Sequence, residues 1–268
     1  MEPTRMEDVQ NQPDDRKIDI EKVGVKNLQY PIVVLDKKNR IQHTVGTINM
    51  YATLADHLKG THMSRFIEVF NQYYVDVSMH NFLDMLVKIR STLHARKAFA
   101  EVTFPYFIEK SAPVSGEKSI MNYVCQYIGE VGEKTRKFYI GIQVPIATVC
   151  PCSMDISEHG AHNQRGIISV KLFFERFFWI EDIIGLIEAA ASTELFTLLK
   201  WEDEKYITEY AFDHPKFVED MVRDVVQKLE DDGRFPWFSV EAENFESIHN
   251  HNAYAYVERG KVIDKVGE

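Results

Sequence analysis

The chain has 268 residues, of which 45% are hydrophobic and 27% are charged, and its 41 acidic residues outnumber its 31 basic residues to give a formal net charge of −10. This composition excludes a disordered chain, a collagen-like repeat and a disulfide-dense mini-protein, and the length suffices for one large domain or two modules. The acidic balance argues against binding to nucleic-acid polymers, because an acidic surface repels the phosphate backbone.

The sequence also lacks the usual signals of membrane insertion and secretion. No apolar run reaches the roughly 18 residues that a membrane span requires. The first residues, from Met1 to Asp8, contain no apolar segment of a secretory signal. The count of three cysteines is odd, which is a poor basis for a disulfide framework and suits a reducing compartment. The sequence therefore predicts a cytoplasmic protein with no membrane partner.

The N-terminal 22 residues have the composition of a solvated tail. They contain seven acidic and four basic residues, two prolines and no cluster of apolar residues. After them, apolar residues typical of strands recur over 31–35 and 41–54, with a polar turn between the two segments. We therefore expect a disordered acidic tail over 1–22 and a single bimodular catalytic domain over 23–268.

Two helices and four strands are predicted next along the chain. Apolar residues recur at helical spacing on one face of 79–97, and a shorter helix is expected near 62–73. The following segments are rich in Phe, Tyr, Val and Ile and predict strands over 98–109, 119–130, 136–148 and 165–176.

A second helical pair follows, over 179–200 and about 214–231. Asp213 is expected as the N-cap of the later helix, with Pro215 in its first turn. Two final strands are predicted over 237–248 and 253–258.

The predicted elements repeat the order ββααββ in two halves, at about 23–131 and 132–260. Each half predicts an antiparallel sheet with two helices on one face, which is an α+β architecture. The other sheet face and the sheet edges would remain uncovered, which favours oligomerisation.

Negative charge concentrates in the segment 201–232. This segment holds eleven acidic and four basic residues, a local net charge of −7 within the chain's −10. For any single acid, a solvated helix face is the ordinary interpretation.

Cysteine and histidine cluster in the segment 150–162, which holds two of each between two predicted strands. Loops on a rigid sheet often carry functional sites, and thiolate and imidazole suit a zinc-like ion. The spacing differs from that of zinc fingers and of zinc deaminases. For Cys150 and His162 the pattern leaves open metal ligation or plain packing, whereas Cys152 and His159 suit an ordinary core residue and an exposed loop residue.

A second polar cluster lies at 241–251. If this segment is a strand, Glu241 and Glu243 share one face with His249 and His251, and the intervening acid Glu246 faces the other side unless the strand ends or bulges. Histidines at i and i+2 beside carboxylates suit metal ligation or proton transfer, and a polar strand end is the alternative. The P-loop, dinucleotide-binding and serine-hydrolase motifs are absent.

The strings Cys150-Pro-Cys-Ser and Gly160-Ala-His-Asn-Gln-Arg strongly resemble the type IB GTP cyclohydrolases of bacteria. Further matches begin at Asp203, Pro215 and Asn244, so the likeness covers essentially everything after the tail. The resemblance implies the tunnelling fold, a bimodular subunit whose ββααββ halves assemble into an oligomeric barrel. It implies a homo-oligomer, expected as a homotetramer, with active sites at subunit interfaces.

The resemblance also implies a reaction. GTP is the substrate, its guanine imidazole ring is opened by hydrolysis, C8 leaves as formate, and rearrangement gives 7,8-dihydroneopterin triphosphate in the first step of tetrahydrofolate biosynthesis. Because C8 is a weak electrophile, water must be activated, and a divalent ion does this by lowering the pKa of bound water. The resemblance implies Mn, Fe or Zn as the cofactor.

The resemblance assigns roles residue by residue. Glu219 matches the carboxylate that anchors guanine through its N1–H and exocyclic amine, and Arg165 is the expected partner of the triphosphate. His249 and His251 match the proton-transfer groups. The residues that match metal ligands are Cys150, which also counts as catalytic, His162, Glu204 and Glu246.

The likeness has departures and competitors. Met154 stands where a Lys is expected, and Glu158-His159 where an Asp-Tyr pair is usual, both outside the ligand positions. One competing hypothesis is the archaeal cyclohydrolase of the same fold, which gives a cyclic phosphate product. A queuosine-pathway nitrile reductase is another, but its substrate and cofactor signature is not found. The third is a non-enzymatic module with a structural zinc, which would need four protein ligands.

Overall fold

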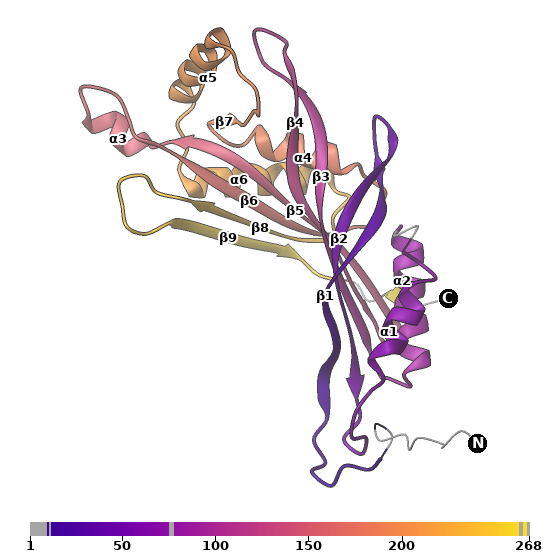
Figure 1. The fold of residues 1–268 in the computed structure, drawn as a ribbon. Helices are drawn as coiled ribbons and strands as arrows, with labels where there is room; N and C mark the ends of the chain where they lie inside the picture. Colours follow the sequence, from indigo (N-terminus) through magenta and orange to yellow (C-terminus); the bar gives the residue numbers. More distant parts are fainter. Residues whose placement is uncertain (1–9, 11, 75–77, 263–264, 267–268) are drawn as a thin grey trace.

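Alternating apolar and polar residues build a large part of this chain into long strands. The structure is a computed structural model that describes residues 10, 12–74, 78–262 and 265–266. Within these residues one antiparallel sheet of ten strands follows the order β1-β2-β3-β4-β5-β6-β8-β9, and β7 and β10 each pair with β5 (Figure 1). The strands are β1 (Ile20–Asp36), β2 (Arg40–Leu54), β3 (Ala98–Ser111), β4 (Lys118–Val131), β5 (Thr135–Val149), β6 (Asn163–Phe173), β7 (Thr193–Glu194), β8 (Trp237–Asn244), β9 (Ala253–Gly260) and β10 (Lys265–Val266).

Helices cover one face of this sheet. In the first pair, the second helix packs on β3, β4 and β5, and the first helix packs on the second helix and on β1. The later helices pack on β5, β8 and β9. Because every second strand residue points to the helices, a single hydrophobic core runs through both halves. No helix among the described residues has the length and apolar character needed to cross a membrane. The helices are α1 (Met63–Phe70), α2 (Met79–Thr92), α3 (Pro151–Ile156), α4 (Ile180–Glu188), α5 (Trp201–Asp213) and α6 (Val218–Asp232).

The α+β fold with a repeated ββααββ order is confirmed. The predicted strands agree with the observed ones to within a few residues. The exceptions are β1, which begins at Ile20 before the predicted start at 31, and β10 near the C-terminus, which was not predicted. The expected boundary between the halves, 131/132, falls in the turn between β4 and β5, across which the sheet continues without a break. The two halves therefore share one sheet and one core.

The second helical region differs from its prediction. Helix α4 ends at Glu188, because the next residues turn back and Thr193–Glu194 pair with β5 as strand β7. The expected helix over 179–200 is therefore correct in its first half, Ile180–Glu188, and wrong in the rest. Asp213, expected as an N-cap, is the last residue of the unpredicted helix α5. Pro215 lies between α5 and α6, where its missing N–H and its steric effect on the preceding residue separate the two helices.

The expected tail differs in part as well. Residues 1–9 and 11 of the segment 1–22 lie outside the described residues. The Gly60 N–H donates to the carbonyl of Gln10 at 3.0 Å, the Lys59 N–H donates to the carbonyl of Gln12 at 3.0 Å, and β1 already begins at Ile20. Backbone pairing does not require apolar side chains, so the sparse apolar content of this stretch did not reveal it.

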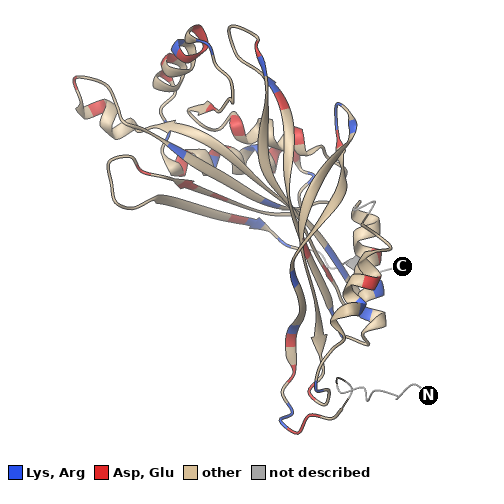
Figure 2. Ribbon diagram, viewed as in Figure 1, with Lys and Arg blue, Asp and Glu red and all other residues tan. Residues whose placement is uncertain are grey.

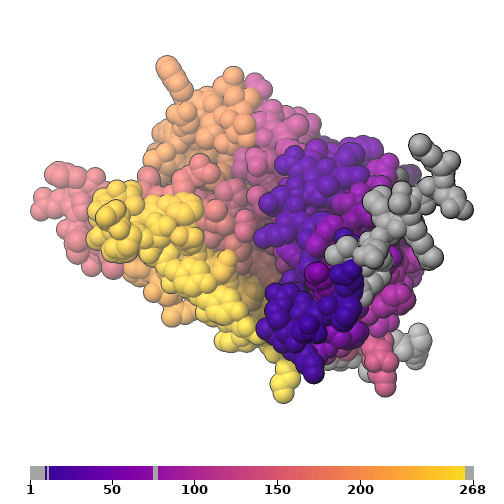
Figure 3. All heavy atoms as spheres, turned by 60° about the horizontal axis from the view of Figure 1, so that its bottom comes forward, coloured from indigo at the N-terminus to yellow at the C-terminus, as the bar shows by residue number. Residues whose placement is uncertain are grey.

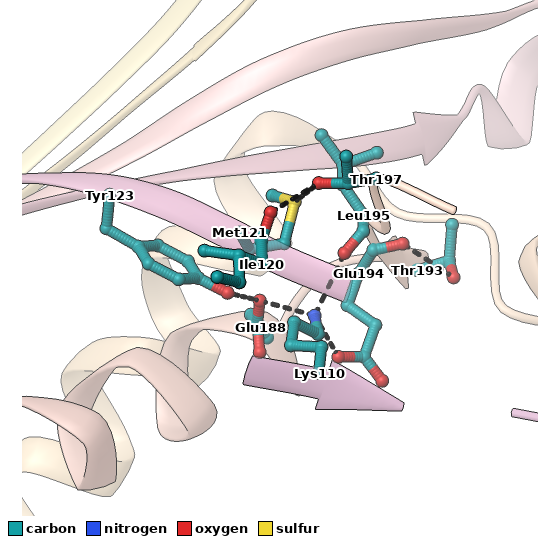
Figure 4. Close-up of polar contacts among 9 residues, drawn as sticks. All are labelled: Lys110, Ile120, Met121, Tyr123, Glu188, Thr193, Glu194, Leu195 and Thr197. Carbon is teal, nitrogen blue, oxygen red and sulfur yellow. Dashed lines mark hydrogen bonds and ion pairs between the residues drawn. The ribbon is translucent and has the colours of Figure 1, made fainter. Parts of the chain in front are cut away.

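A nearly buried ion cluster fastens the segment after α4 to the first half. Lys110 of β3 is 9% exposed and contacts the Glu188 carboxylate at 2.8 Å, the Leu195 carbonyl at 3.0 Å and the Glu194 carboxylate (Figure 4). The Tyr123 hydroxyl donates to Glu188 at 2.7 Å. Burial raises the pKa of Glu188, which the neighbouring Lys110 opposes. The cluster holds β7 beside the end of β5, where the candidate site begins.

Candidate active site

Cys150 and His162 lie opposite each other at the open end of the β5–β6 hairpin. Val149 and Asn163 form the last residue pair of these strands, and the Cys150 N–H donates to the His162 carbonyl at 3.1 Å. Both side chains are half-buried. A cysteine and a histidine that lie twelve positions apart in the sequence thus become neighbours across the hairpin through strand pairing.

The loop between them is fixed by its own polar groups. Cys150 occupies the N-cap position of α3, with Pro151 as the first helical residue. The Ser153 hydroxyl donates to the Cys150 carbonyl at 3.1 Å and accepts from the His162 N–H at 3.2 Å. Gly160 has φ +112°, in the region that favours glycine. These contacts hold both strand ends in place below the loop.

The loop after β8 reaches the same place. The Ser247 hydroxyl lies 3.3 Å from His162 Nδ1, and the Phe245 N–H donates to the Arg165 carbonyl at 2.9 Å. Glu246, which lies between Phe245 and Ser247, is half-buried. The structure therefore brings the segment of Glu246 next to His162.

Strand β8 ends at Asn244, earlier than the predicted end at 248. Glu241 and Glu243 share the half-buried face as expected, and both carboxylates accept hydrogen bonds within the β8–β9 hairpin, from Tyr254 at 2.9 Å and from Asn252 at 2.7 Å. The alternation of strand faces therefore does not predict where His249 and His251 point, because both lie in the loop after β8. There the rings of His249 and His251 stack with centroids 5.1 Å apart.

Two acidic residues of the site prediction lie in the first turns of α5 and α6. Glu219 is exposed, and the Lys216 N–H just before α6 donates to the carbonyl of Val149 at 3.1 Å, which ties this helix start to the residue before Cys150. Glu204 is also exposed. It lies two turns from Phe212, the α5 residue nearest to Gly160 of the loop, a rise of about 12 Å along the helix.

A single chain therefore does not bring together a complete set of metal ligands. Among the described residues, no group of three or more His, Cys, Asp or Glu side chains could hold a metal ion. The structure brings together Cys150, His162 and the segment of Glu246, and leaves Glu204 on an exposed helix face. A thiol beside an imidazole still suits the divalent ions that prefer soft and nitrogen donors.

The remaining cysteines differ in their surroundings. Cys152 is exposed in the first turn of α3, and Cys125 is fully buried in the core. Burial raises the pKa of the Cys125 thiol. The prediction that Cys152 packs in the core is therefore wrong, because the short helix α3 buries none of its residues.

Arg165 lies on the sheet face opposite the helices. It lines a cavity of about 430 Å³ with Gln143 and Phe196, and a neighbouring cavity of about 590 Å³ with Phe245 and Ser247. No Asp or Glu among the described residues forms an ion pair with its guanidinium. Figure 2 shows where the acidic (red) and basic (blue) residues lie along the chain. The charge of Arg165 is available for an anion.

Asp203 is a buried acid for which the sequence predicted no role of its own. Its carboxylate accepts hydrogen bonds from the Val114 and Ser115 N–H groups, both at 2.9 Å, from the Ser115 hydroxyl at 2.6 Å, and from the Lys200 N–H at 2.9 Å. Desolvation raises the pKa of Asp203, but the hydrogen bonds from Ser115, Lys200 and Val114 outweigh it and hold that pKa well below its ordinary value. Asp203 thereby joins the start of α5 to the β3–β4 turn of the other half.

Replacing Asp203 by alanine is expected to lower the melting temperature by about 5 °C or more, because four donors lose one shared acceptor. Circular dichroism during heating measures this change. The matched control is Glu202→Ala, an exposed acid of the same helical turn, which should leave the melting temperature unchanged. Equal melting temperatures for both variants would contradict the anchoring role of Asp203.

The sequence matches a known family along most of its length. The family model described as type I GTP cyclohydrolase folE2 matches residues 6–255. A "GTP cyclohydrolase FolE2" of Syntrophus aciditrophicus (strain SB) is 56% identical over 254 residues, covering 95% of this chain and 100% of the relative. Another, of Geotalea uraniireducens (strain Rf4), is 52% identical over 256 residues, covering 96% of this chain and 94% of the relative.

The fold is similar to that of a solved structure with little sequence likeness. The uricase from Arthrobacter globiformis superposes with a TM-score of 0.53 at 9% identity, covering 90% of this chain and 93% of that chain. At this identity the likeness concerns the fold alone. It confirms the tunnelling-fold architecture of the chain, and assembly into a barrel stays a prediction.

Proposed function

The chain belongs to the type I GTP cyclohydrolase FolE2 family and is a GTP cyclohydrolase of the folate pathway, and we propose that it opens GTP at a site built around Cys150 and His162. The products of the proposed reaction are 7,8-dihydroneopterin triphosphate and formate, as in the type IB subclass. The observation that supports this site best is the backbone hydrogen bond between Cys150 and His162, which makes the two residues neighbours at the end of the β5–β6 hairpin.

GTP cyclohydrolases of this kind generally depend on a metal, and the chemistry of a cysteine beside a histidine suits one. In the proposed site Cys150, His162, Glu204 and Glu246 would hold Mn, Fe or Zn. When bound, such an ion lowers the pKa of the water that attacks C8 of guanine. The chemistry of a thiolate, an imidazole and carboxylates suits all three ions.

The remaining residues bind the nucleotide and move protons. Glu219 is proposed to accept hydrogen bonds from the guanine N1–H and the exocyclic amine, two donors that match one carboxylate. His249 and His251 are proposed to protonate the ring nitrogen that leaves C8 and to serve the sugar rearrangement. Their stacked rings in the loop beside Ser247 are compatible with both roles.

Arg165 is the proposed partner of the triphosphate. Its exposed guanidinium, which has no acidic partner among the described residues, lines two neighbouring cavities on the face that also presents Ser247. In a chain with a net charge of −10, a local positive charge is required to hold an anionic substrate.

The active form is proposed to be a homotetramer with sites at subunit interfaces. Strands β1 and β9 are the two edges of the sheet path, and the indigo and yellow atoms of these two chain segments are both at the surface in the view of Figure 3. Tyr254 and Tyr256 of β9 are 58% and 49% exposed, which is typical of a surface that becomes covered. A neighbouring chain could then bring a carboxylate such as Glu204 to Cys150 and His162.

The cytoplasm is the proposed compartment, in keeping with three free thiols.

A turnover assay tests this function. The protein is loaded with Mn, Fe or Zn and incubated with GTP, and formate and fluorescent oxidised neopterin are measured. Both products are expected in equal amounts. Formation of a cyclic phosphate instead of the triphosphate would point to the archaeal-type reaction, and no formate with any of the three metals would overturn the proposal.

A further inference from the structure

A short polar chain leads from the buried sheet to the ring of His162. His162 Nδ1 lies 2.9 Å from Gln164 Oε1, and Gln164 Nε2 donates to the Thr148 hydroxyl at 2.9 Å. Gln164 is 7% exposed and Thr148 is fully buried. Buried polar groups of this kind are costly unless each finds a partner, and here the chain of contacts ends on the imidazole.

Strand pairing sets this geometry. Thr148 and Gln164 are direct partners in the register of β5 and β6, one step inside the pair of strand ends that carry Cys150 and His162. The Ser192 hydroxyl accepts the neighbouring Val149 N–H at 3.1 Å and packs the same end of the sheet. The amide of Gln164 is therefore held by the two strands rather than by a flexible loop.

The amide determines which nitrogen of His162 is free. An amide oxygen can only accept a hydrogen bond, so Nδ1 of His162 must carry the hydrogen when it faces Gln164 Oε1. The lone pair then resides on Nε2. The exposed Ser247 hydroxyl, at 3.3 Å from Nδ1, can donate or accept and so does not select a tautomer.

We propose that Gln164, held by Thr148, is a positioning residue that fixes the Nδ1–H tautomer of His162 and presents Nε2 to a divalent metal ion. This proposal rests on the proposed function, in which His162 is a metal ligand. Partners of this kind orient a ligating histidine and raise its basicity, and their loss typically weakens metal binding 10–100-fold.

Two substitutions separate the polarity of this contact from its volume. Gln164→Met keeps the size of the side chain and removes both hydrogen-bonding groups. Gln164→Glu keeps an oxygen that can accept from His162 Nδ1–H and removes the amide donor. It therefore preserves the proposed contact. If instead the amide of Gln164 donates to Nδ1, this variant would lose the contact.

The chain offers a matched control in a second cross-strand pair. Gln126 of β4 donates to the hydroxyl of Thr103 of β3 at 3.2 Å, and these two residues are also direct register partners. No histidine lies beside this pair within hydrogen-bonding distance among the described contacts. Gln126→Met thus removes the same type of contact without touching the site.

The experiment measures the dissociation constant of Zn²⁺ at pH 7 by competition with a chromogenic chelator, on full-length proteins first stripped of metal. Gln164→Met is expected to bind Zn²⁺ about 10–100-fold more weakly than the unchanged protein, whereas Gln164→Glu stays within about threefold and Gln126→Met is unchanged. Unchanged affinity in Gln164→Met, or an equal loss in Gln164→Glu, would overturn the proposal.

Two further variants distinguish an error in the positioning role of Gln164 from an error in the proposed metal site. His162→Ala and Cys150→Ala are measured in the same assay, and both should lose Zn²⁺ binding. If they keep it, the metal site itself is wrong; if they lose it while Gln164→Met does not, only the positioning role is wrong. Should the metal-free melting temperature show that Gln164→Met is unfolded, Thr148→Val tests the same chain, with weaker Zn²⁺ binding expected and unchanged binding contradicting it.

Discussion

Replacing Cys150 by alanine is expected to lower kcat for GTP hydrolysis by at least about 1000-fold, because water activation by a metal supplies several kcal/mol of transition-state stabilisation. Metal binding should weaken by more than about 100-fold, beyond the loss typical of a residue that only orients a ligand. Cys150 directly follows the last residue of strand β5 and lies opposite His162. Formate release and bound metal per subunit are the two measurements.

The neighbouring thiol provides the control for this experiment. Cys152 lies two residues further on, is exposed and makes no contact with His162 among the described hydrogen bonds. Cys152→Ala should therefore retain both metal and turnover. If Cys150→Ala keeps its metal and its activity, the thiolate has been placed wrongly, whatever the family of the chain.

The strands and their repeat could be predicted because each strand buries one face. From Met121 to Val131, for example, every second residue of β4 is buried or nearly so, and the same alternation appears in β8. Such a pattern is local in the sequence and period two is unambiguous over this length. The predicted order of elements followed from it without any knowledge of the tertiary contacts.

Helix α5 escaped prediction for the opposite reason. Its large apolar residues are exposed, with Trp201 at 88%, and only Asp203 and Ala211 are buried. Without an apolar stripe facing the core, helical periodicity gives no signal. This helix is instead held by the carboxylate of Asp203, whose partners Val114 and Ser115 lie almost ninety positions away in the sequence.

The candidate site, like the fold, could be predicted only in part. The closeness of Cys150 and His162 follows from two neighbouring antiparallel strands that end beside them. The orientation of Gln164 toward the imidazole depends on which face of β6 it occupies and on a partner across the strand, which the motif alone does not specify. For Glu204 the sequence likeness assigns a role that a single chain does not complete.

The acidic residues of the segment 201–232 differ in whether they form ion pairs, which the composition does not show. Several of its acids are engaged: Asp220 pairs with Arg223 at 3.2 Å and Asp232 with Arg234 at 2.5 Å. Glu219, in contrast, is exposed and pairs with no cation among the described residues. An unpaired carboxylate at the start of a helix tied to Val149 is free to accept hydrogen bonds from a base.

Glu219→Ala is therefore expected to lower kcat/KM for GTP by about 100- to 10,000-fold and to leave the metal content unchanged. Each charge-assisted hydrogen bond to guanine contributes about 1.5–3 kcal/mol, and the variant loses two. The exposed Glu230→Ala, near the other end of α6, should behave like the unchanged protein because its contact with Arg259 is distant from the site and exposed.

Inosine triphosphate makes this expectation specific to the guanine contact. It lacks the exocyclic amine, so the unchanged protein should prefer GTP by about 10- to 100-fold in kcat/KM, the equivalent of one charge-assisted hydrogen bond. In Glu219→Ala neither nucleotide can use the carboxylate, and the ratio should approach one. A variant that loses activity but keeps the preference for GTP would show that another residue reads the amine, and that Glu219 supports the site only through the start of α6.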